Sequence, residues 1–508
     1  MFRWYRPGVT QFDLVITNAQ VVRPELDRTD RGLDIGILDG RIAALRAGLA
    51  ASARSEGCEV VDAADMLAFP GSVDAHTHMG IYQPLQDDAV TESRAAAVGG
   101  TTTVLNYMRT GQYYLNQGGP YEQFFPQVLD LMEGRSHVDY AFHLAPMQAS
   151  HIDEIPMLVE RFGVTSFKIF MFYGSHGLHG RSADQSEFLM TPPGERYDYA
   201  HFEFVMRGIA RAREQFPELA DQISLSMHCE TAEIMAAYTK LVEEAGELTG
   251  LAAYSASRPP HSEGLAVTIA SYLAHETECP TINLLHLSGA KAMDAALRMA
   301  RAFPNVNFRR EVTIGHLLAD IDTANGVYGK VNPPLRPRQD VEALWVHVLA
   351  GEVDWVVSDH ACCQAEHKVS AEHPEDIWLA KSGFGGTEYL LSGLFSEGTK
   401  RGLSPAGVAR LLSTNPAARY GLTGKGSLEV GSDADIALLD PTITYVVRAA
   451  DSPSAQEYTP FEGHELTGQV RHVWLRGQRI LRDGSVVGEP HGRYQDRGPN
   501  RAGARPPA

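Results

Sequence analysis

The segment Phe69–Gly80, FPGSVDAHTHMG, decides how the rest of the chain is interpreted. Its apolar residues are interrupted by Pro-Gly and then continue into His76-Thr77-His78. Residues i and i+2 of a β-strand point to the same face, so the two histidines would project side by side. Two neutral imidazoles on one strand face can hold a zinc, iron, copper or nickel ion. Because the chain has 20 histidines, one such pair can also arise by chance or pack without a metal.

Composition and charge narrow the class of protein. The 508 residues, 44% of them hydrophobic, are enough for a large α/β barrel with attached structure. A formal net charge of −19 argues against a nucleic-acid or anionic-membrane partner, because both favour basic surfaces. No apolar run reaches the roughly 18 residues of a membrane span, and the N-terminal MFRWYRPGVTQ lacks a signal-peptide core. With five scattered cysteines, these features predict a cytoplasmic protein without a disulfide framework.

Eight apolar, strand-like segments alternate with helical patterns through the middle of the chain. Amphipathic patterns such as FEFVMRGIARAREQF and AMDAALRMARAF lie between them. Eight parallel strands with crossover helices specify a closed (β/α)8 barrel, so the predicted fold class is α/β. The eight segments are residues 68–78, 101–108, 138–146, 163–173, 222–230, 281–288, 305–313 and 353–360.

Short strand patterns flank the barrel on both sides. The N-terminal pattern includes a hairpin signal at Asp39-Gly40. We expect the segments 1–68 and 425–495 to build one small β-sandwich domain around a barrel domain at 69–424. Residues 496–508 are rich in Pro, Gly, Arg and Ala and are predicted to be disordered.

Titratable side chains recur where the predicted barrel strands end. A barrel builds its active site at the carboxyl ends of its strands. One buried histidine is usually a satisfied core residue, and a lysine within an apolar strand is rare without a partner. Their joint occurrence at the strand ends predicts a shared metal site. The candidate ligands, in chain order, are His76, His78, Lys168, His228, His286 and Asp359.

The order His-x-His, Lys, His, His, Asp resembles the signature of the amidohydrolase superfamily. The blocks GVTSFKIFMFY, SMHCE, SRPPHSEG, LLHLS, KVNPPLR, SDH and TPFEG are similar to its cyclic amidase branch, which contains dihydropyrimidinases, hydantoinases, allantoinases and dihydroorotases. The similarity extends over residues 12–494. It implies a TIM-barrel hydrolase that opens a cyclic amide or imide ring and assembles as a dimer or tetramer.

The resemblance also implies roles for individual residues. Lys168 would react with carbon dioxide to become N6-carboxylysine and bridge two divalent metal ions, zinc by default. A hydroxide activated by the metals would attack the ring carbonyl. Asp359 would act as general base and then general acid, and Tyr173 would donate to the developing oxyanion. The two ions would be held by His76, His78 and Asp359 on one side and by His228 and His286 on the other.

Positions that determine the substrate depart from the relatives. Dihydroorotase-like members have an arginine two residues after the second histidine of the pair, which binds a substrate carboxylate. Gly80 stands there in this chain, which argues against an acidic substrate. Asn332 and Ser382 occupy the places from which hydantoinases and dihydropyrimidinases hold the cyclic imide. Asn332 can equally be a strand-end cap.

Two loops add features of their own. Residues 174–202 form a long polar insertion, in which His176 and His179 are expected to face solvent. Aromatic residues from the loop after the second strand and from two other loops are expected to form an apolar pocket for a ring substituent. These aromatic residues are Tyr82, Tyr113, Tyr114 and Phe384.

Other functions are kept as alternatives. Within the enzymes, these are an allantoinase-like ureide hydrolase and a hydrolase of other lactams or cyclic imides. A non-catalytic scaffold of the same fold would have lost metal ligands, whereas every expected ligand is present here. A mononuclear amidohydrolase such as a deaminase has no need for Lys168 in its strand.

Overall fold

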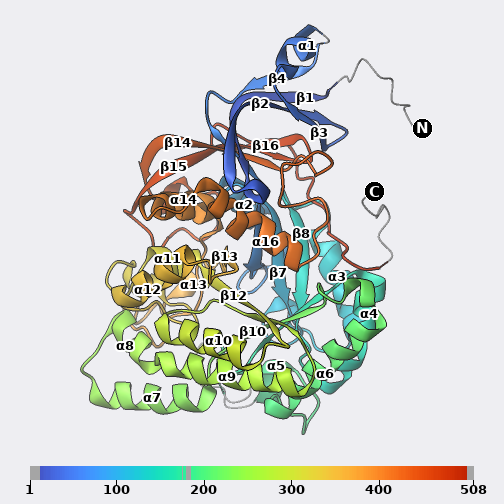
Figure 1. Cartoon of the computed structure of the whole chain (residues 1–508). Coiled ribbons are helices and arrows are strands. Elements are labelled where there is room, and N and C mark those ends of the chain that lie inside the picture. The colour runs from blue at the N-terminus through green and yellow to red at the C-terminus, as the bar shows by residue number, and fades with distance from the viewer. Residues whose placement is uncertain (1–11, 56, 174–175, 179–184, 500–508) are drawn as a thin grey trace.

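Two sheets organise the part of the chain that the structure describes. The computed structural model describes residues 12–55, 57–173, 176–178 and 185–499. In Figure 1, an eight-stranded sheet occupies the middle of the molecule among helices, and a second, nine-stranded sheet lies at its top. The two sheets come from different parts of the chain, because the second one combines strands from both ends.

The first sheet is a parallel barrel. Each strand pairs in parallel with the next one along the chain. A parallel bridge between Thr77 and His360 joins the two edges of the sheet, which confirms the predicted (β/α)8 fold. The strands are β6 (Ser72–Thr77), β7 (Thr101–Met108), β8 (Asp139–Leu144), β9 (Ser166–Phe170), β10 (Ser224–His228), β11 (Thr281–Leu284), β12 (Asn307–Thr313) and β13 (Trp355–Val357).

Amphipathic helices cover the barrel. On α4 (Ala149–Phe162), Ile152, Ile155 and Leu158 are buried and recur at three-residue spacing, so they form one apolar stripe. This helix ends at Gly163, whose φ of 63° suits glycine because it has no Cβ. The other helices are α1 (Leu49–Ser55), α2 (Leu85–Val98), α3 (Tyr121–Met132), α5 (Gln185–Leu189), α6 (Tyr199–Gln215), α7 (Ala232–Ala245), α8 (Gly250–Ser257), α9 (Pro260–Glu276), α10 (Ala290–Ala302), α11 (Ile314–Leu318), α12 (Arg338–Leu349), α13 (Ala365–Lys368), α14 (Leu390–Lys400), α15 (Pro405–Ala409) and α16 (Asn415–Arg419).

The second sheet joins the two ends of the chain. Its strand β5 pairs with β1 on one side and with β14 on the other. Strands from both ends enclose one apolar core that contains Ile16, Ile35, Ile436 and Trp474, as predicted for a small β-sandwich. The strands are β1 (Leu14–Arg23), β2 (Arg28–Leu38), β3 (Arg41–Arg46), β4 (Glu59–Asp62), β5 (Leu67–Pro70), β14 (Ile436–Val446), β15 (Glu465–Leu475), β16 (Gln478–Arg482) and β17 (Ser485–Val486).

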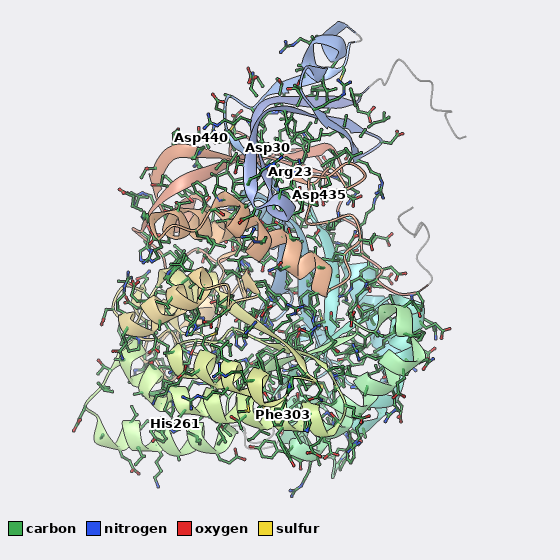
Figure 2. All side chains as sticks on the ribbon, viewed as in Figure 1. Arg23, Asp30, His261, Phe303, Asp435 and Asp440 are labelled. Atoms are coloured by element: carbon green, nitrogen blue, oxygen red, sulfur yellow. The ribbon has the colours of Figure 1, made fainter. Side chains whose placement is uncertain are left out.

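The predicted hairpin at Asp39-Gly40 lies between β2 and β3 of this sheet. Both residues have positive φ, 49° and 75°, as a two-residue hairpin turn of type I′ requires. The strands of this sheet lie at one end of the molecule, and helices lie at the opposite end. Figure 2 labels Arg23, Asp30, Asp435 and Asp440 at the strand-rich end and His261 and Phe303 among the helices.

The end of the chain departs from the prediction of a disordered tail over residues 496–508. Arg497 is 1% exposed. Its guanidinium donates hydrogen bonds to Ser166 Oγ at 2.9 Å and to the carbonyl oxygen of Phe142 at 2.7 Å. The prediction is therefore wrong for residues 496–499, because this arginine satisfies polar groups of two barrel strands. Residues 500–508 lie outside the described part of the chain.

Two further observations bear on the class of protein. Among the described residues, no helix combines the length and the apolar character needed to cross a lipid bilayer. All five cysteines are free thiols, and four of them are buried. Both observations agree with the composition of the chain.

Candidate metal centre and substrate cavity

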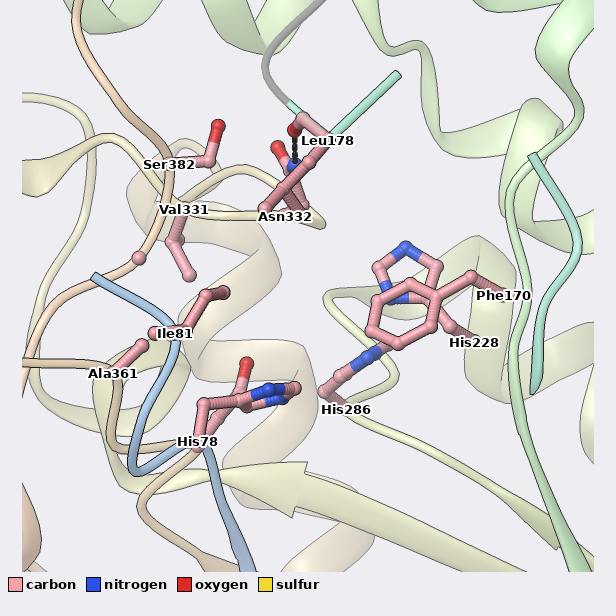
Figure 3. Close-up of a pocket in the computed structure, with 12 residues that line it drawn as sticks. His78, Ile81, Phe170, Leu178, His228, His286, Val331, Asn332, Ala361 and Ser382 are labelled. Atoms are coloured by element: carbon pink, nitrogen blue, oxygen red, sulfur yellow. Dashed lines mark hydrogen bonds and ion pairs between the residues drawn. The ribbon is translucent and has the colours of Figure 1, made fainter. Parts of the chain in front are cut away.

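The predicted metal ligands meet at one end of the barrel. They lie on β6, β9 and β10 or within two residues after the ends of β6, β11 and β13. Because all the barrel strands are parallel, their carboxyl ends form one rim. Figure 3 shows the imidazoles of His78, His228 and His286 at this rim, around a common cavity.

Four side chains form the tightest part of the cluster. His76 Nε2 lies 3.2 Å from His78 Nε2. Lys168 Nζ lies 2.5 Å and 3.1 Å from these two nitrogens, and Asp359 Oδ1 lies 3.0 Å and 3.3 Å from them. All four side chains are buried. Facing imidazole nitrogens repel each other unless a proton or a cation lies between them, so this arrangement needs a positive charge at its centre.

His228 and His286 complete the cluster from the other side. Their ring centres are 4.3 Å apart, and the ring centre of His286 lies 5.5 Å from that of His76. Among the described residues, the buried Nδ1 atoms of His228 and His286 have no hydrogen-bond partner. A buried polar atom without a partner destabilises the fold, so a ligand is expected there. Imidazole and carboxylate donors suit divalent transition metals, and the residues therefore fit a metal centre.

Two members of the cluster have a strained backbone. His286 has φ 33° and Asp359 has φ 55°. Residues other than glycine rarely adopt this left-handed region. Each residue lies where the chain leaves a barrel strand, and the turn brings its side chain to the rim. Strain of this kind costs about 1–3 kcal/mol per residue and clusters at functional sites.

Burial lowers the pKa of most basic members of the cluster, whereas for His76 it opposes, but does not outweigh, the charges of Asp359 and Glu311, which raise the pKa. Burial lowers the pKa of Lys168 to about 7 and the pKa of His78 to about 3. It also holds the pKa values of His228 and His286 well below that of ordinary histidine. Burial opposes the ionisation of Asp359, but the two imidazoles that face its carboxylate hold its pKa well below the ordinary value. Neutral imidazoles and an ionised carboxylate are the forms that bind metal ions.

Glu311 contacts two of the candidate ligands, and the sequence pattern did not single it out. Its Oε1 lies 2.8 Å from His76 Nδ1 and accepts a hydrogen bond from the backbone N–H of His286 at 3.2 Å. Its Oε2 accepts a hydrogen bond from Trp355 Nε1 at 2.9 Å. Such outer partners fix the orientation and the tautomer of a metal-binding histidine. The available signal was a glutamate within the predicted strand segment NFRREVT, and the structure shows that its carboxylate is fully buried.

Glu230 and Tyr114 orient two other histidines. Glu230 Oε2 lies 2.7 Å from His228 Nε2 and accepts its N–H, which leaves the lone pair of Nδ1 to coordinate a metal. Tyr114 Oη lies 2.5 Å from His78 Nδ1. The His-x-Glu spacing was a signal for Glu230. No local pattern indicates the contact of Tyr114, because a loop with positive φ at this residue brings it there.

A cavity separates the cluster from the loops opposite. Asn332 and Ser382, both predicted to contact the substrate, line it. Its described lining contains no lysine or arginine, so it suits an uncharged molecule. Apart from the metal cluster, Asn332 and Ser382, its wall consists of Ile81, Phe170, Leu178, Val331, Ala361 and Gly383.

Tyr173 is not among the lining residues. Its ring stacks on that of Phe170, with the ring centres 4.6 Å apart and the planes at 10°, and Phe170 forms the wall. Burial raises the pKa of Tyr173 to about 12, although the charge of Arg109 acts in the opposite direction. The guanidinium carbon of Arg109 lies 5.2 Å from the Tyr173 ring centre. The role of Tyr173 as a hydrogen-bond donor to the substrate stays a prediction.

The insertion after β9 contributes to the wall of the cavity through Leu178. His176 is 4% exposed, and its ring centre lies 6.2 Å from that of Phe172. The prediction that His176 faces solvent is therefore wrong, because the chain turns inward at this point. His179 lies outside the described residues.

The four aromatic residues predicted to form a pocket for a ring substituent do not all line the same cavity. Tyr82, Tyr113 and Tyr114 line a second cavity of about 390 Å³, which shares Ile81 with the first one. Phe384 does not line it and packs against Phe461, with ring centres 6.1 Å apart. The predicted pocket therefore contains the three tyrosines without the phenylalanine.

Known proteins are similar to this chain in sequence and in fold. A model of the amidohydrolase family matches residues 220–480. An allantoinase of Rubrobacter xylanophilus is 33% identical over 492 residues, which cover 96% of this chain and 98% of the relative. A D-hydantoinase of Geobacillus stearothermophilus is 30% identical over 478 residues, which cover 91% of this chain and 93% of the relative. The crystal structure of a dihydropyrimidinase from Brevibacillus agri matches with a TM-score of 0.80 at 26% identity, over 97% of this chain and 99% of that one.

The barrel, the second sheet and the ligand cluster define the class of metal-dependent barrel hydrolases. The chain belongs to the amidohydrolase family, which confirms the resemblance seen in its sequence. Members of this family generally bind a dinuclear metal centre. Among the described residues, donor atoms of His76, His286 and Asp359 lie within 4.8 Å of one another and are candidate ligands for it.

Proposed function

We propose that this protein hydrolyses the amide bond of a small, uncharged cyclic amide or imide and so opens the ring, as a hydantoinase or dihydropyrimidinase does. The observation that carries the proposal is the convergence of four imidazoles, one amine and one carboxylate on a single rim, where two buried Nδ1 atoms find no hydrogen-bond partner in the described part of the chain. Relatives named allantoinase and D-hydantoinase, aligned over 96% and 91% of the chain, support the same reaction class.

Lys168 is proposed to carry a carboxyl group. The carbon of carbon dioxide forms a bond to the neutral Nζ and one proton leaves, so the amine becomes an anionic carbamate. Burial favours this step, because a pKa of about 7 leaves part of the amine neutral. Two divalent ions, zinc by default, supply polarisation of the scissile carbonyl and lower the pKa of a water to about 7. The carbamate would be shared between an ion on His76, His78 and Asp359 and an ion on His228 and His286.

Asp359 is proposed to move the proton. Its carboxylate lines the cavity and is ionised. It takes the proton of the attacking water and delivers it to the ring nitrogen as the C–N bond breaks. Asn332 and Ser382 hold the polar edge of the ring. For Tyr173 to donate to the carbonyl oxygen, its ring has to move out from behind Phe170.

A ring-opening assay on purified protein supplied with bicarbonate and zinc tests this function. The panel contains dihydrouracil, hydantoin, 5-phenylhydantoin, allantoin, dihydroorotate, succinimide and a simple lactam. We expect turnover of uncharged rings, lost at least about 10³-fold in Asp359→Asn because the proton carrier is removed. We expect no turnover of dihydroorotate, because neither Gly80 nor the described lining offers a cation. Two bound metals without turnover of any ring would contradict the substrate class, and no bound metal would contradict the mechanism.

An allantoinase-like ureide hydrolase is the second candidate. The 33% identity to the Rubrobacter allantoinase favours it, and the allantoin arm of the same panel tests it.

We further propose a cytoplasmic location and a dimeric or tetrameric state. Size-exclusion chromatography with light scattering checks the oligomeric state, and a monomer would contradict it.

A further inference from the structure

Two buried lysines without a carboxylate partner lie beside the substrate cavity. Lys330 and Lys368 are both 0% exposed. Among the described residues, neither amine pairs with a carboxylate, and both donate hydrogen bonds to backbone carbonyl oxygens. Burial lowers the pKa of both amines, that of Lys368 to about 7. Because a buried amine without a counter-ion destabilises the fold, this lysine pair is expected to have a function.

Lys368 joins two segments of the cavity wall. Its Nζ donates hydrogen bonds to the carbonyl oxygen of Lys330 at 2.9 Å and to that of Gly383 at 2.7 Å. The backbone N–H of Gly383 also donates to the carbonyl oxygen of Lys330, at 2.9 Å. Gly383 lines the cavity, and Lys330 directly precedes Val331, which lines it too. One amine therefore spans the point at which the two segments meet.

Lys330 makes the reverse connection, to residues 361–383, which lie after the last barrel strand and form the cavity loop. Its Nζ donates hydrogen bonds to the carbonyl oxygens of Ile377 at 2.8 Å and Ala380 at 2.6 Å, both in this loop. A carbonyl oxygen can only accept, so these contacts need a donor and an apolar side chain cannot replace them. Each lysine of the pair therefore binds the segment that carries the other.

Tyr254 connects the lysine pair to the polar residues of the cavity. The centre of its ring lies 4.7 Å from Lys330 Nζ. Its hydroxyl donates a hydrogen bond to Asn332 Oδ1 and lies 3.3 Å from Ser382 Oγ. Figure 3 shows Asn332 and Ser382 on the side of the cavity away from His78. Asn332 and Ser382 come one from each of the two joined segments, so the distance between them depends on how these segments are held.

We propose that Lys368 is a positioning residue that fixes the separation of the two segments of the cavity wall and thereby sets the affinity for the substrate ring. The proposal rests on the proposed function, because it takes this cavity as the substrate site. Walls that are already held in place bind a ring without first having to be ordered, which strengthens binding. Lys368 is neither a candidate metal ligand nor a lining residue, so it acts on binding and not directly on the chemical step.

Amide hydrogen exchange tests the connection without turnover. In Lys368→Met, loaded with zinc and bicarbonate, the side chain stays unbranched but cannot donate. Exchange in residues 369–383 is expected to be at least about tenfold faster than in wild type, because opening of the loop no longer breaks the two hydrogen bonds of the amine. Exchange in β8 and β9 should stay unchanged. Glu366→Gln, at an exposed position of the same helix α13, is the matched control and should keep wild-type exchange.

Turnover separates positioning from a general structural role. With a ring substrate that wild type opens, Lys368→Met is expected to raise KM at least about tenfold and to change kcat less than about threefold, because ordering of the walls opposes binding and leaves the chemical step unaltered. Metal content should stay at the wild-type value. Lys368→Gln has two N–H donors on a shorter side chain and can keep one of the two hydrogen bonds, so it is expected to raise KM only about threefold. This variant provides the test if Lys368→Met fails to fold.

Each result bears on one proposal. Wild-type exchange of residues 369–383 in folded Lys368→Met would overturn the positioning role, and so would a loss of metal or a fall in kcat of more than about tenfold. If exchange changes as expected but wild type opens no ring, the connection between the segments stands and the proposed function fails. If wild type opens rings and every variant has the same KM, the proposed function stands and the role of Lys368 fails.

Discussion

Lys168 and Lys425 are both buried, but opposite kinds of neighbours surround them. Lys168 Nζ faces two imidazole nitrogens at 2.5 Å and 3.1 Å, at the carboxyl end of the barrel. Lys425 Nζ lies 2.6 Å from a carboxylate oxygen of Asp139 and 2.7 Å from one of Asp435. Asp139 is the first residue of β8 and Asp435 directly precedes β14, so this second cluster lies at the amino end of the barrel, toward the β-sandwich.

The neighbours decide what each amine can do. Burial lowers the pKa of Lys168 to about 7. Burial also opposes the charge of Lys425, but the surrounding carboxylates raise its pKa above the ordinary value. A buried amine among carboxylates is a permanent cation that compensates their charge. The direct contacts of Lys168 are imidazoles, and burial outweighs the charges of Asp359 and Glu311, so this amine is not held as a permanent cation and is available for chemistry, which is typical of functional sites.

The largest expected effect comes from removing the chemically available amine. Lys168→Ala is expected to lower ring opening at least about 10³-fold, because the proposed anionic carbamate, a shared ligand of two metal ions, is lost. Addition of propionate should restore part of the rate, since a short carboxylate fits the space that the side chain leaves. The measurement is the ring-opening rate together with metal content. Turnover close to wild type in the alanine variant would show that Lys168 has no chemical role and so contradict its distinction from Lys425.

The structural lysine should show its role in stability instead. Lys425→Met is expected to lower the free energy of unfolding by about 3–5 kcal/mol, because Asp435 stays buried after losing its lysine partner and Asp139 keeps only Arg476 as a counter-ion. Urea denaturation measures this change. The matched control is Lys400→Met, which breaks an exposed pair with Glu397 and should change stability by less than about 1 kcal/mol. Equal effects of the two substitutions would refute the distinction.

A third buried lysine, Lys368, extends the comparison to the pH dependence of the free energy of unfolding. Its Nζ donates hydrogen bonds to the carbonyl oxygens of Lys330 and Gly383 at 2.9 Å and 2.7 Å, and burial lowers its pKa from 10.5 to about 7. Between these pH values the unfolded chain binds more protons than the folded one, so this group makes stability rise with pH. Lys425, whose pKa is raised, has the opposite sign and loses its contribution only above pH 10.5.

The difference between wild type and Lys368→Met isolates this group from other titrations. From pH 7 to pH 9.5, the free energy of unfolding of wild type is expected to gain about 3 kcal/mol relative to the variant. Urea denaturation at both pH values provides the measurement. A parallel pH dependence in the two proteins would show that the amine is not destabilised by burial.

The smallest expected effect concerns the outer partners of the metal ligands. Glu311→Gln keeps the size of the side chain but removes the charge beside His76 Nδ1. Metal affinity is expected to fall about 10- to 100-fold, as measured by titration against a competing chelator. The control is Glu397→Gln. Glu397 lies on α14, where it pairs with Lys400, and its substitution should leave metal affinity unchanged. An unaltered affinity in Glu311→Gln would reduce this residue to a packing role.

Much of the barrel could be predicted from local patterns. The segment 101–108 coincides with β7, because its threonine, valine and tyrosine residues favour strands, and all eight residues are buried. The candidate ligands were found because parallel strands bring their carboxyl ends to one rim. The position of Tyr173 behind Phe170 could not be predicted, since it depends on how the chain turns after β9. The buried state of His176 has the same origin.

The sequence by itself therefore determined the fold class, the family and the identity of the candidate ligands, since these depend on periodicity and on the order of residues along the chain. The tertiary structure alone decided the partners: Glu311 for His76, Tyr254 for the polar pair of the cavity, and Arg497 for two barrel strands. The physical reason is that these contacts join residues hundreds or tens of positions apart. Which buried donor meets which acceptor is decided only when loops close and every polar group must find a partner away from water.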